Sequence, residues 1–215
     1  MAEMPFPALR LRPPAGFVPL PLDADQERRS RGARELAQRM SGAVGMPVDE
    51  LTDAVLAVGE RVGGLNVRLL GSFAVTSSGD PATAAMVLTV QELRATRSAL
   101  SAEDRSSAAR ALHELVRRRS PDAESQVIQL PVGPAVATVF LGEFRIPPER
   151  SGRDAELVVP VHRAQFLIPA PTGRHLVVLE VSTGSEQAWP AVAEQAVATA
   201  RSIRFQAVSP LSEAS

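Results

Sequence analysis

AELVVPVHRAQFLIPAPTGRHLVVLEVSTGSEQAWPAVAEQAVATARSIRF, residues 155–205, is the stretch that decides the fold. Two apolar runs, 155–168 and 174–183, flank the sequence PAPTG at 169–173, where proline and glycine favour a tight turn. In the second run every other residue lines one face of a strand: His175, Val177, Leu179 and Val181. The pattern predicts a β-hairpin that leads directly into a helix.

The segment after the hairpin has the spacing of an amphipathic helix. Its apolar residues recur at intervals of three and four and form a stripe over an arc of roughly 140°: Trp189, Val192, Ala193, Ala196, Val197, Ala200 and Ile203. Pro190 suits the first turn, where an N–H group has no helical acceptor. We therefore expect the helix to pack on the sheet. We also expect Val197→Asp to be severely destabilising, because it would place an unpaired charge in the core.

The composition closes several routes to catalysis. The chain has 215 residues, of which 45% are hydrophobic, enough for one core of good size. It contains no cysteine, lysine or tyrosine, which excludes disulfides, thiol nucleophiles, zinc–thiolate sites, Schiff bases and phosphate-loop lysines. The use of arginine alone is typical of high-GC bacterial codon usage. A net charge of −1 gives no long-range attraction to nucleic acid or anionic lipid.

The N-terminal residues are rich in proline and contain no apolar run of signal-peptide or membrane-span length. This indicates a cytoplasmic protein. We expect a flexible Pro-rich segment at residues 1–15, a single α+β domain at 16–206 and a flexible tail at 207–215.

The remaining elements follow from periodicity and punctuation. We expect an edge strand at 17–20, helices at about 25–40 and 47–62, a hairpin of strands 67–75 and 84–90, a helix at 101–119, and strands at 126–130 and 135–146. Asp23 or Asp25 is expected to cap the first helix, and Ser101 with Asp104 resembles a capping box for the third. The inward residues of these helices are predicted to be Ala33, Leu36, Ala37 and Met40; Leu51, Ala54, Val55, Val58 and Val62; and Ala108, Leu112, Leu115 and Val116.

Short connections between the strands predict a mainly antiparallel arrangement. The fold class is therefore α+β, a curved sheet of about six to seven strands with four helices packed against it. Because strand 135–146 is apolar on both faces at its start, we expect it to be central and covered on both sides.

Three histidines are the only side chains that titrate near neutrality. His113 is expected on the surface of a helix. If Ile168 pairs with Arg174 across the hairpin, His162 faces Glu180 and His175 faces Leu167. The first pair would be either a general base oriented by a carboxylate or, more commonly, a structural cross-strand contact.

No metal or cofactor site is predicted. The aspartate pairs near helix starts, Asp23 with Asp25 and Asp49 with Asp53, are better explained as caps than as metal ligands.

The runs QFLIPAPTGRHLVVLEVSTGSEQAW (165–189) and AVAEQAVATARSIRF (191–205) resemble the C-terminal signature of PsbP-like α/β domains. GFVPLPLD at 16–23 is similar to the opening of bacterial members. The resemblance implies a curved antiparallel sheet with helices against its faces and mostly non-catalytic, accessory or protein-binding roles. The segment 24–62 departs from the family core.

The leading functional hypothesis is a non-enzymatic accessory or protein-interaction module with a protein partner, no cofactor, and no nucleic-acid or membrane target. It would bind through a sheet face or edge near the Pro-rich strand. The alternative is a small-molecule or lipid-binding domain with a cavity between sheet and helices, lined by Ala84, Ala85, Ala135 and Ala137. A third possibility is a hydrolase built on His162 and Glu180.

Overall fold

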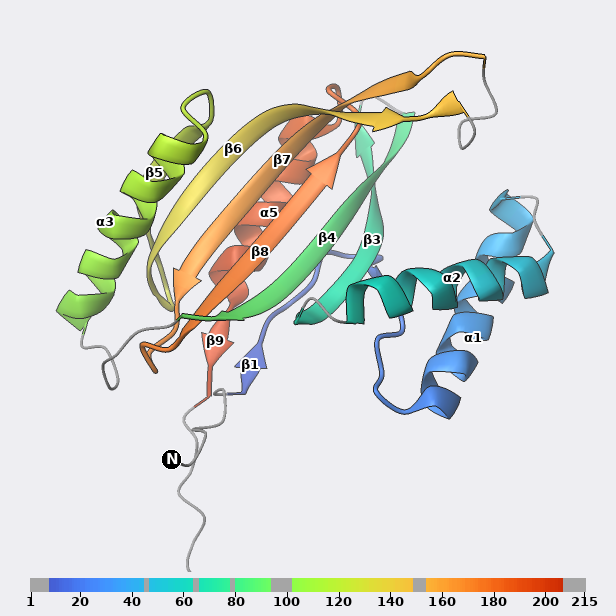
Figure 1. Ribbon diagram of the computed structural model, residues 1–215, viewed down its shortest axis with the longest axis horizontal. Helices are drawn as coiled ribbons and strands as arrows, with labels where there is room; N and C mark the ends of the chain where they lie inside the picture. The colour runs from blue at the N-terminus through green and yellow to red at the C-terminus, as the bar shows by residue number, and fades with distance from the viewer. Residues whose placement is uncertain are drawn as a thin grey trace, which may run out of the picture.

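A computed structural model describes residues 8–44, 47–63, 66–77, 80–93, 102–148 and 154–206. Its centre is an antiparallel sheet of seven strands in the order β2-β3-β4-β8-β7-β6-β5, and a second pair, β1 and β9, lies at one end (Figure 1). The strands are β1 (Leu9–Arg10), β2 (Val18–Pro19), β3 (Val67–Ser77), β4 (Asp80–Glu92), β5 (Glu124–Leu130), β6 (Gly133–Ile146), β7 (Leu157–Pro169), β8 (His175–Thr183) and β9 (Arg204–Phe205). The predicted α+β class with a curved antiparallel sheet is confirmed.

The described residues also form four helices, α1 (Gln26–Val44), α2 (Val48–Gly63), α3 (Ala102–Arg119) and α5 (Trp189–Ser202). Helices α5 and α3 cover opposite faces of the sheet, whereas α1 and α2 form a hairpin beside β3 (Figure 1). None of these helices is long and apolar enough to cross a membrane.

Helix α5 packs on β8, β3 and β7 and closes the larger hydrophobic core. Val177, Leu179 and Val181 of β8 form the floor and are fully buried, as are Val192 and Ile203 above them. Trp189 is half-buried.

The predicted face of α5 is wrong at one edge. Val197 is 45% exposed, and Thr199 is buried in its place. The stripe of apolar residues on α5 is wider than the surface that contacts the sheet. The helix is rotated so that the side of the stripe with Val197 faces solvent. The assumption that Val197 lies in the core is therefore wrong, and the severe destabilisation expected of Val197→Asp loses its physical basis.

Helix α3 covers the other face of the sheet, over β5, β6 and β7. Leu112 and Val116 pack on a second core cluster, which consists of Val136, Leu167, Leu176 and Val178. The predicted inward position of Leu115 is wrong, since Leu115 is exposed; Ala108 is half-buried, and its neighbour Ala109 is the fully buried alanine. Ser101, the proposed cap, lies outside the described residues.

Strand β6 is penultimate in the sheet, not central as predicted; β8 holds the central position. The first half of β6 is covered on both faces, and its residues Ala135 and Val136 are fully buried. Beyond Val139 it has no partner on the β5 side, and Leu141, opposite the last β7 residue that pairs with β8, is 75% exposed. From Gly142 on, β6 and β7 pair only with each other. The end of β6 is therefore exposed, although its start is apolar on both faces and buried.

The α1–α2 hairpin packs on the edge strand β2 through Ala33, Leu36, Val55, Val18 and Leu20. The carboxylate of Asp25 accepts a hydrogen bond from the Arg28 N–H at 2.9 Å, which confirms the predicted cap. On α2 the predicted positions Ala54 and Val58 are exposed, whereas Thr52 is buried beside Leu51. The side chain of Met40 lies outside what the structure describes.

Within the segment 1–15, which we expected to be flexible, residues 8–15 are described and Leu9–Arg10 form a strand. Leu9 pairs with Phe205 and Arg10 with Arg204, so β1 and β9 join the two ends of the described chain. The Arg12 N–H donates to Ser202 Oγ at 2.8 Å, and the Gln206 N–H donates to the Ala8 carbonyl at 2.8 Å. This strand was not predicted, because it is only two residues long and lies in a proline-rich segment. Its partner strand β9 also lies nearly 200 positions away in the sequence.

Candidate functional site

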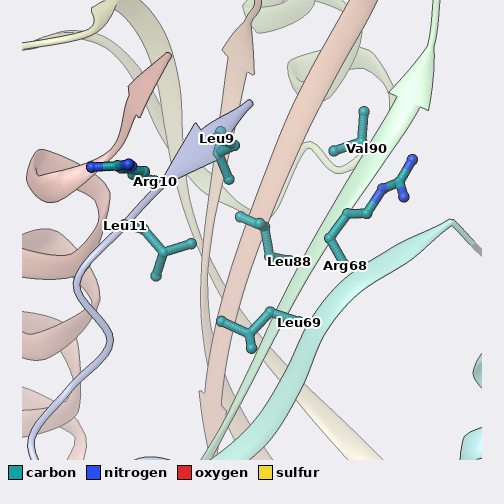
Figure 2. A pocket seen from close by; sticks show the side chains of 7 residues that line it. All are labelled: Leu9, Arg10, Leu11, Arg68, Leu69, Leu88 and Val90. Atoms are coloured by element: carbon teal, nitrogen blue, oxygen red, sulfur yellow. The ribbon is translucent and has the colours of Figure 1, made fainter. Parts of the chain in front are cut away.

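A groove lies between the β1 segment and the end of the sheet where β3 begins and β4 ends. It has a volume of about 660 Å³, within the range of pockets that hold small ligands. Its lining residues are Leu9, Arg10, Leu11, Arg68, Leu69, Leu88 and Val90. Figure 2 shows the aliphatic side chains of β1, β3 and β4 turned toward the same space.

The floor of the groove is an extension of the main core. Leu88 and Val90 alternate along β4 with residues of the opposite face, and both are buried. Leu69 of β3 stands directly across from Leu88. The wall opposite comes from Leu9 and Leu11, which are half-buried on the segment that begins with β1. Helix α5 does not reach this part of the sheet, so the wall and floor leave a space between them.

A β-bulge brings one charged residue to the groove. Val67 pairs with Thr89 and Leu69 with Leu88, so Arg68 is an extra residue without a partner position on β4. In a regular strand Arg68 and Leu69 would face opposite sides of the sheet. With the bulge, both residues line the groove (Figure 2).

The two arginines of the groove differ in their surroundings. With the Gln206 amide oriented to satisfy both contacts, its oxygen accepts hydrogen bonds from Arg10 Nε at 2.8 Å and Nη2 at 3.1 Å. The Arg10 guanidinium also points away from the leucines in Figure 2. Arg68 is exposed, and no described residue forms an ion pair or hydrogen bond with its side chain. Arg68 is therefore the groove's available cation.

The predicted pair of His162 and Glu180 is wrong. Strand β7 continues through Pro169, which pairs with Leu176, so the register is shifted by three residues and His162 lies opposite Thr183. Because the shift is odd, the two side chains lie on opposite faces of the sheet. The His162 ring stacks on Trp189 with centroids 5.6 Å apart.

Glu180 has different partners on the α3 face. It accepts a hydrogen bond from Gln165 Nε2 at 3.2 Å and forms an ion pair with Arg163 at 3.6 Å. The Arg163 guanidinium in turn lies 4.4 Å from the centre of the Phe140 ring. These contacts hold the Glu180 carboxylate among side chains of β6 and β7.

The other two histidines make structural contacts. His113, which we expected on the surface, is half-buried, and its Nε2 lies 3.0 Å from the Ser125 carbonyl oxygen between α3 and β5. His175 was expected to face Leu167, but it pairs with Glu92 of β4, and its Nδ1 lies 3.1 Å from Thr172 Oγ1 in the hairpin turn. The three histidines therefore lie at three separate places in the fold and do not form a common site.

The alanines predicted to line a cavity do not do so. Ala84 and Ala135 are buried within the continuous core under α5, and Ala137 packs against that core. Ala85 is exposed, on the other face of β4. The small alanine side chains allow α5 to lie close to the sheet. The observed groove is lined by other residues, from the β1 segment, β3 and β4.

Within the described ranges, no group of three or more His, Asp or Glu side chains is arranged to hold a metal ion. Asp23 accepts a hydrogen bond from the Asp25 N–H at 2.9 Å, which is a local turn contact. Asp49 pairs with Arg34 at 3.0 Å across the α1–α2 hairpin, and both side chains are exposed.

A charged cluster marks the part of β6 and β7 that extends beyond the sheet. Arg145 contacts Glu156 at 3.1 Å and Glu143 at 2.9 Å, and these two carboxylates, Glu156 first, raise the pKa of its guanidinium above the ordinary value. All three side chains are exposed, so these ion pairs contribute little to stability.

No protein-family model matches the chain, and no curated protein is similar to it. The resemblance to PsbP-like domains stays a prediction from the sequence.

Sequence reasoning missed the groove. The alternation Leu9-Arg10-Leu11-Arg12 is a strand signal that could have located its wall. The bulge at Arg68 has no comparable signal, because it is set by the pairing of β3 with β4.

Proposed function

We propose that this protein is a non-catalytic module that binds a small apolar molecule, such as a lipid chain, in the groove between β1 and the β3–β4 strands. The single observation that carries the proposal is a space of about 660 Å³ whose walls and floor are five aliphatic side chains from three strands. Burial of apolar ligand surface there would be favourable by about 25 cal/mol per Å². The separated histidines support a binding role over a hydrolytic one.

The test is displacement of the neutral dye Nile red by 1-decanol. Leu9→Ser and Leu11→Ser should each weaken both ligands several-fold, because each replaces an aliphatic wall with a hydroxyl. Leu115→Ser is the matched control, since Leu115 is a partly exposed leucine on the other face. Equal loss in all three variants, or no binding by the wild-type chain, would contradict the proposal.

A second candidate, protein binding by strand addition, rests on the open edge of β3. Strand β2 pairs only with Gly71 and Ser72, and the Leu70 carbonyl accepts from the Leu20 N–H at 2.7 Å. Since alternate residues face the same edge, Ala74 and Thr76 direct their backbone groups outward, where no described strand pairs with them. A smaller groove of about 220 Å³ separates this edge from Ala191, Glu194 and Gln195 of α5.

An extended peptide laid along that edge would continue the row that β2 begins. Peptides selected from a displayed library against the wild-type chain should lose binding to Thr76→Pro, which removes one outward N–H group. If the selected peptides bind Thr76→Pro and wild type equally, strand addition at this edge is excluded.

A cytoplasmic location in a bacterium and a kinship with PsbP-like domains are part of the proposal, and they rest on the sequence features alone.

A further inference from the structure

The bulged residue Arg68 suggests which apolar molecules the groove selects, an inference that rests on the proposed function. We propose that the groove binds single-chain amphiphiles with an anionic head, of the fatty-carboxylate type. The aliphatic chain would lie on Leu69, Leu88 and the β1 wall, and the carboxylate would meet Arg68.

The first argument is position. The bulge places the Arg68 side chain on the same face as Leu69, at the side of the groove where Val90 lies (Figure 2). A bulge costs one unpaired residue in the ladder, and such irregularities commonly redirect a side chain at a binding site. A fatty carboxylate has the matching layout, an apolar chain that ends in one charged group.

The second argument is charge. Arg10 and Arg204 lie directly opposite each other on β1 and β9, a like-charge pair that opposes pairing. Arg204 turns back to donate to the carbonyls of Arg201 and Ile203, at 2.7 Å each. The segments 8–12 and 199–206 contain four arginines and no acidic residue. The positive charge of these two segments therefore favours an anionic over a cationic ligand in the groove as a whole.

The acidic residue nearest along the floor strand is Glu92, which follows Val90 on the same face of β4. It forms no ion pair with Arg68. A guanidinium binds carboxylates through paired N–H groups, so a ligand carboxylate would supply the acceptor that the described residues do not.

The chemistry favours a single dissolved amphiphile over a membrane surface. The whole chain carries a net charge of −1, which gives no general attraction to anionic bilayers. One groove with one available arginine suits one chain and one head group.

The experiment compares decanoate with 1-decanol as competitors of Nile red, using the full chain at low ionic strength. The two ligands have the same chain length and differ in the head group. Wild type should prefer decanoate by roughly three- to tenfold, as expected for a partly solvated arginine–carboxylate pair. Added salt should reduce that preference.

Arg68→Gln should abolish the preference for decanoate, measured as the ratio of the decanoate affinity to the 1-decanol affinity in the same variant. Arg68→Lys should keep part of it. Arg110→Gln is the matched control, because Arg110 is an exposed arginine on α3 and does not line the groove, and it should retain the wild-type preference.

The outcomes separate the two proposals. Equal binding of acid and alcohol by wild type would overturn the anionic preference while leaving the apolar groove in place. Displacement by neither ligand would overturn both. Binding of phosphatidylglycerol vesicles that depends on Arg68, without binding of decanoate, would overturn the proposal in favour of a membrane-surface site.

Discussion

Single positions on α5 differ sharply in what they tolerate. Val192 is fully buried between the helix and β8, whereas Val197, five residues later, is 45% exposed. Both are valines on the same helix, so the contrast isolates the effect of burial. At the start of the same helix, Trp189 stacks on the imidazole ring of His162 and so covers one face of that ring.

We predict that Val192→Asp prevents stable folding, because a carboxylate would be buried without a partner at a cost of several kcal/mol. Val197→Asp should change the free energy of unfolding by about 1 kcal/mol or less, as expected near the surface. Urea denaturation followed by circular dichroism measures both. Similar losses in the two variants would mean that the helix face is misassigned.

Among the elements, β3 carries the most irregular features, with the bulge at one end, β2 across its middle and an open edge beyond. Gly71 allows β2 to approach. A Cβ at this position would collide with the Val18 carbonyl oxygen and with the ring of Phe17, whose nearest atom would be 2.5 Å away. The backbone oxygen cannot move unless β2 moves with it.

We expect Gly71→Ala to displace β2 and to reduce stability by about 1–3 kcal/mol, the usual cost of overpacking. The Leu20 amide, which donates to Leu70, should then exchange its hydrogen faster. Gly142→Ala on β6 is the control, since a Cβ there meets nothing within 4 Å. It should be neutral or slightly stabilising. Unchanged exchange at Leu20 in Gly71→Ala would contradict this view of the edge.

Across the whole molecule, the N-terminal and C-terminal segments meet at the wall of the groove. The hydroxyl oxygen of Ser202 accepts from the Arg12 N–H at 2.8 Å, and the same hydroxyl contacts the Thr199 carbonyl at 2.7 Å. One side chain therefore links the last turn of α5 to the segment that carries Leu11.

Ser202→Ala should cost about 1 kcal/mol of stability, speed hydrogen exchange at Arg12 and weaken 1-decanol binding, because the wall would be held less firmly. Ser107→Ala serves as the control; its hydroxyl accepts only an exposed contact from Arg110 at 3.0 Å. If 1-decanol binds the Ser202→Ala chain as tightly as wild type, the β1–β9 pair does not position the groove.

The sequence by itself determined the elements from β2 to α5 and their order, because alternation, helical spacing and turn residues act within a few positions of one another. It also placed Val177, Leu179 and Val181 in the core. Only the tertiary structure decided the β7–β8 register that separates His162 from Glu180, the bulge at Arg68 and the rotation of α5 that exposes Val197. It alone decided the pairing of β1 with β9. Each of these depends on which distant surfaces meet, and contacts between segments nearly 200 residues apart leave no period in the chain.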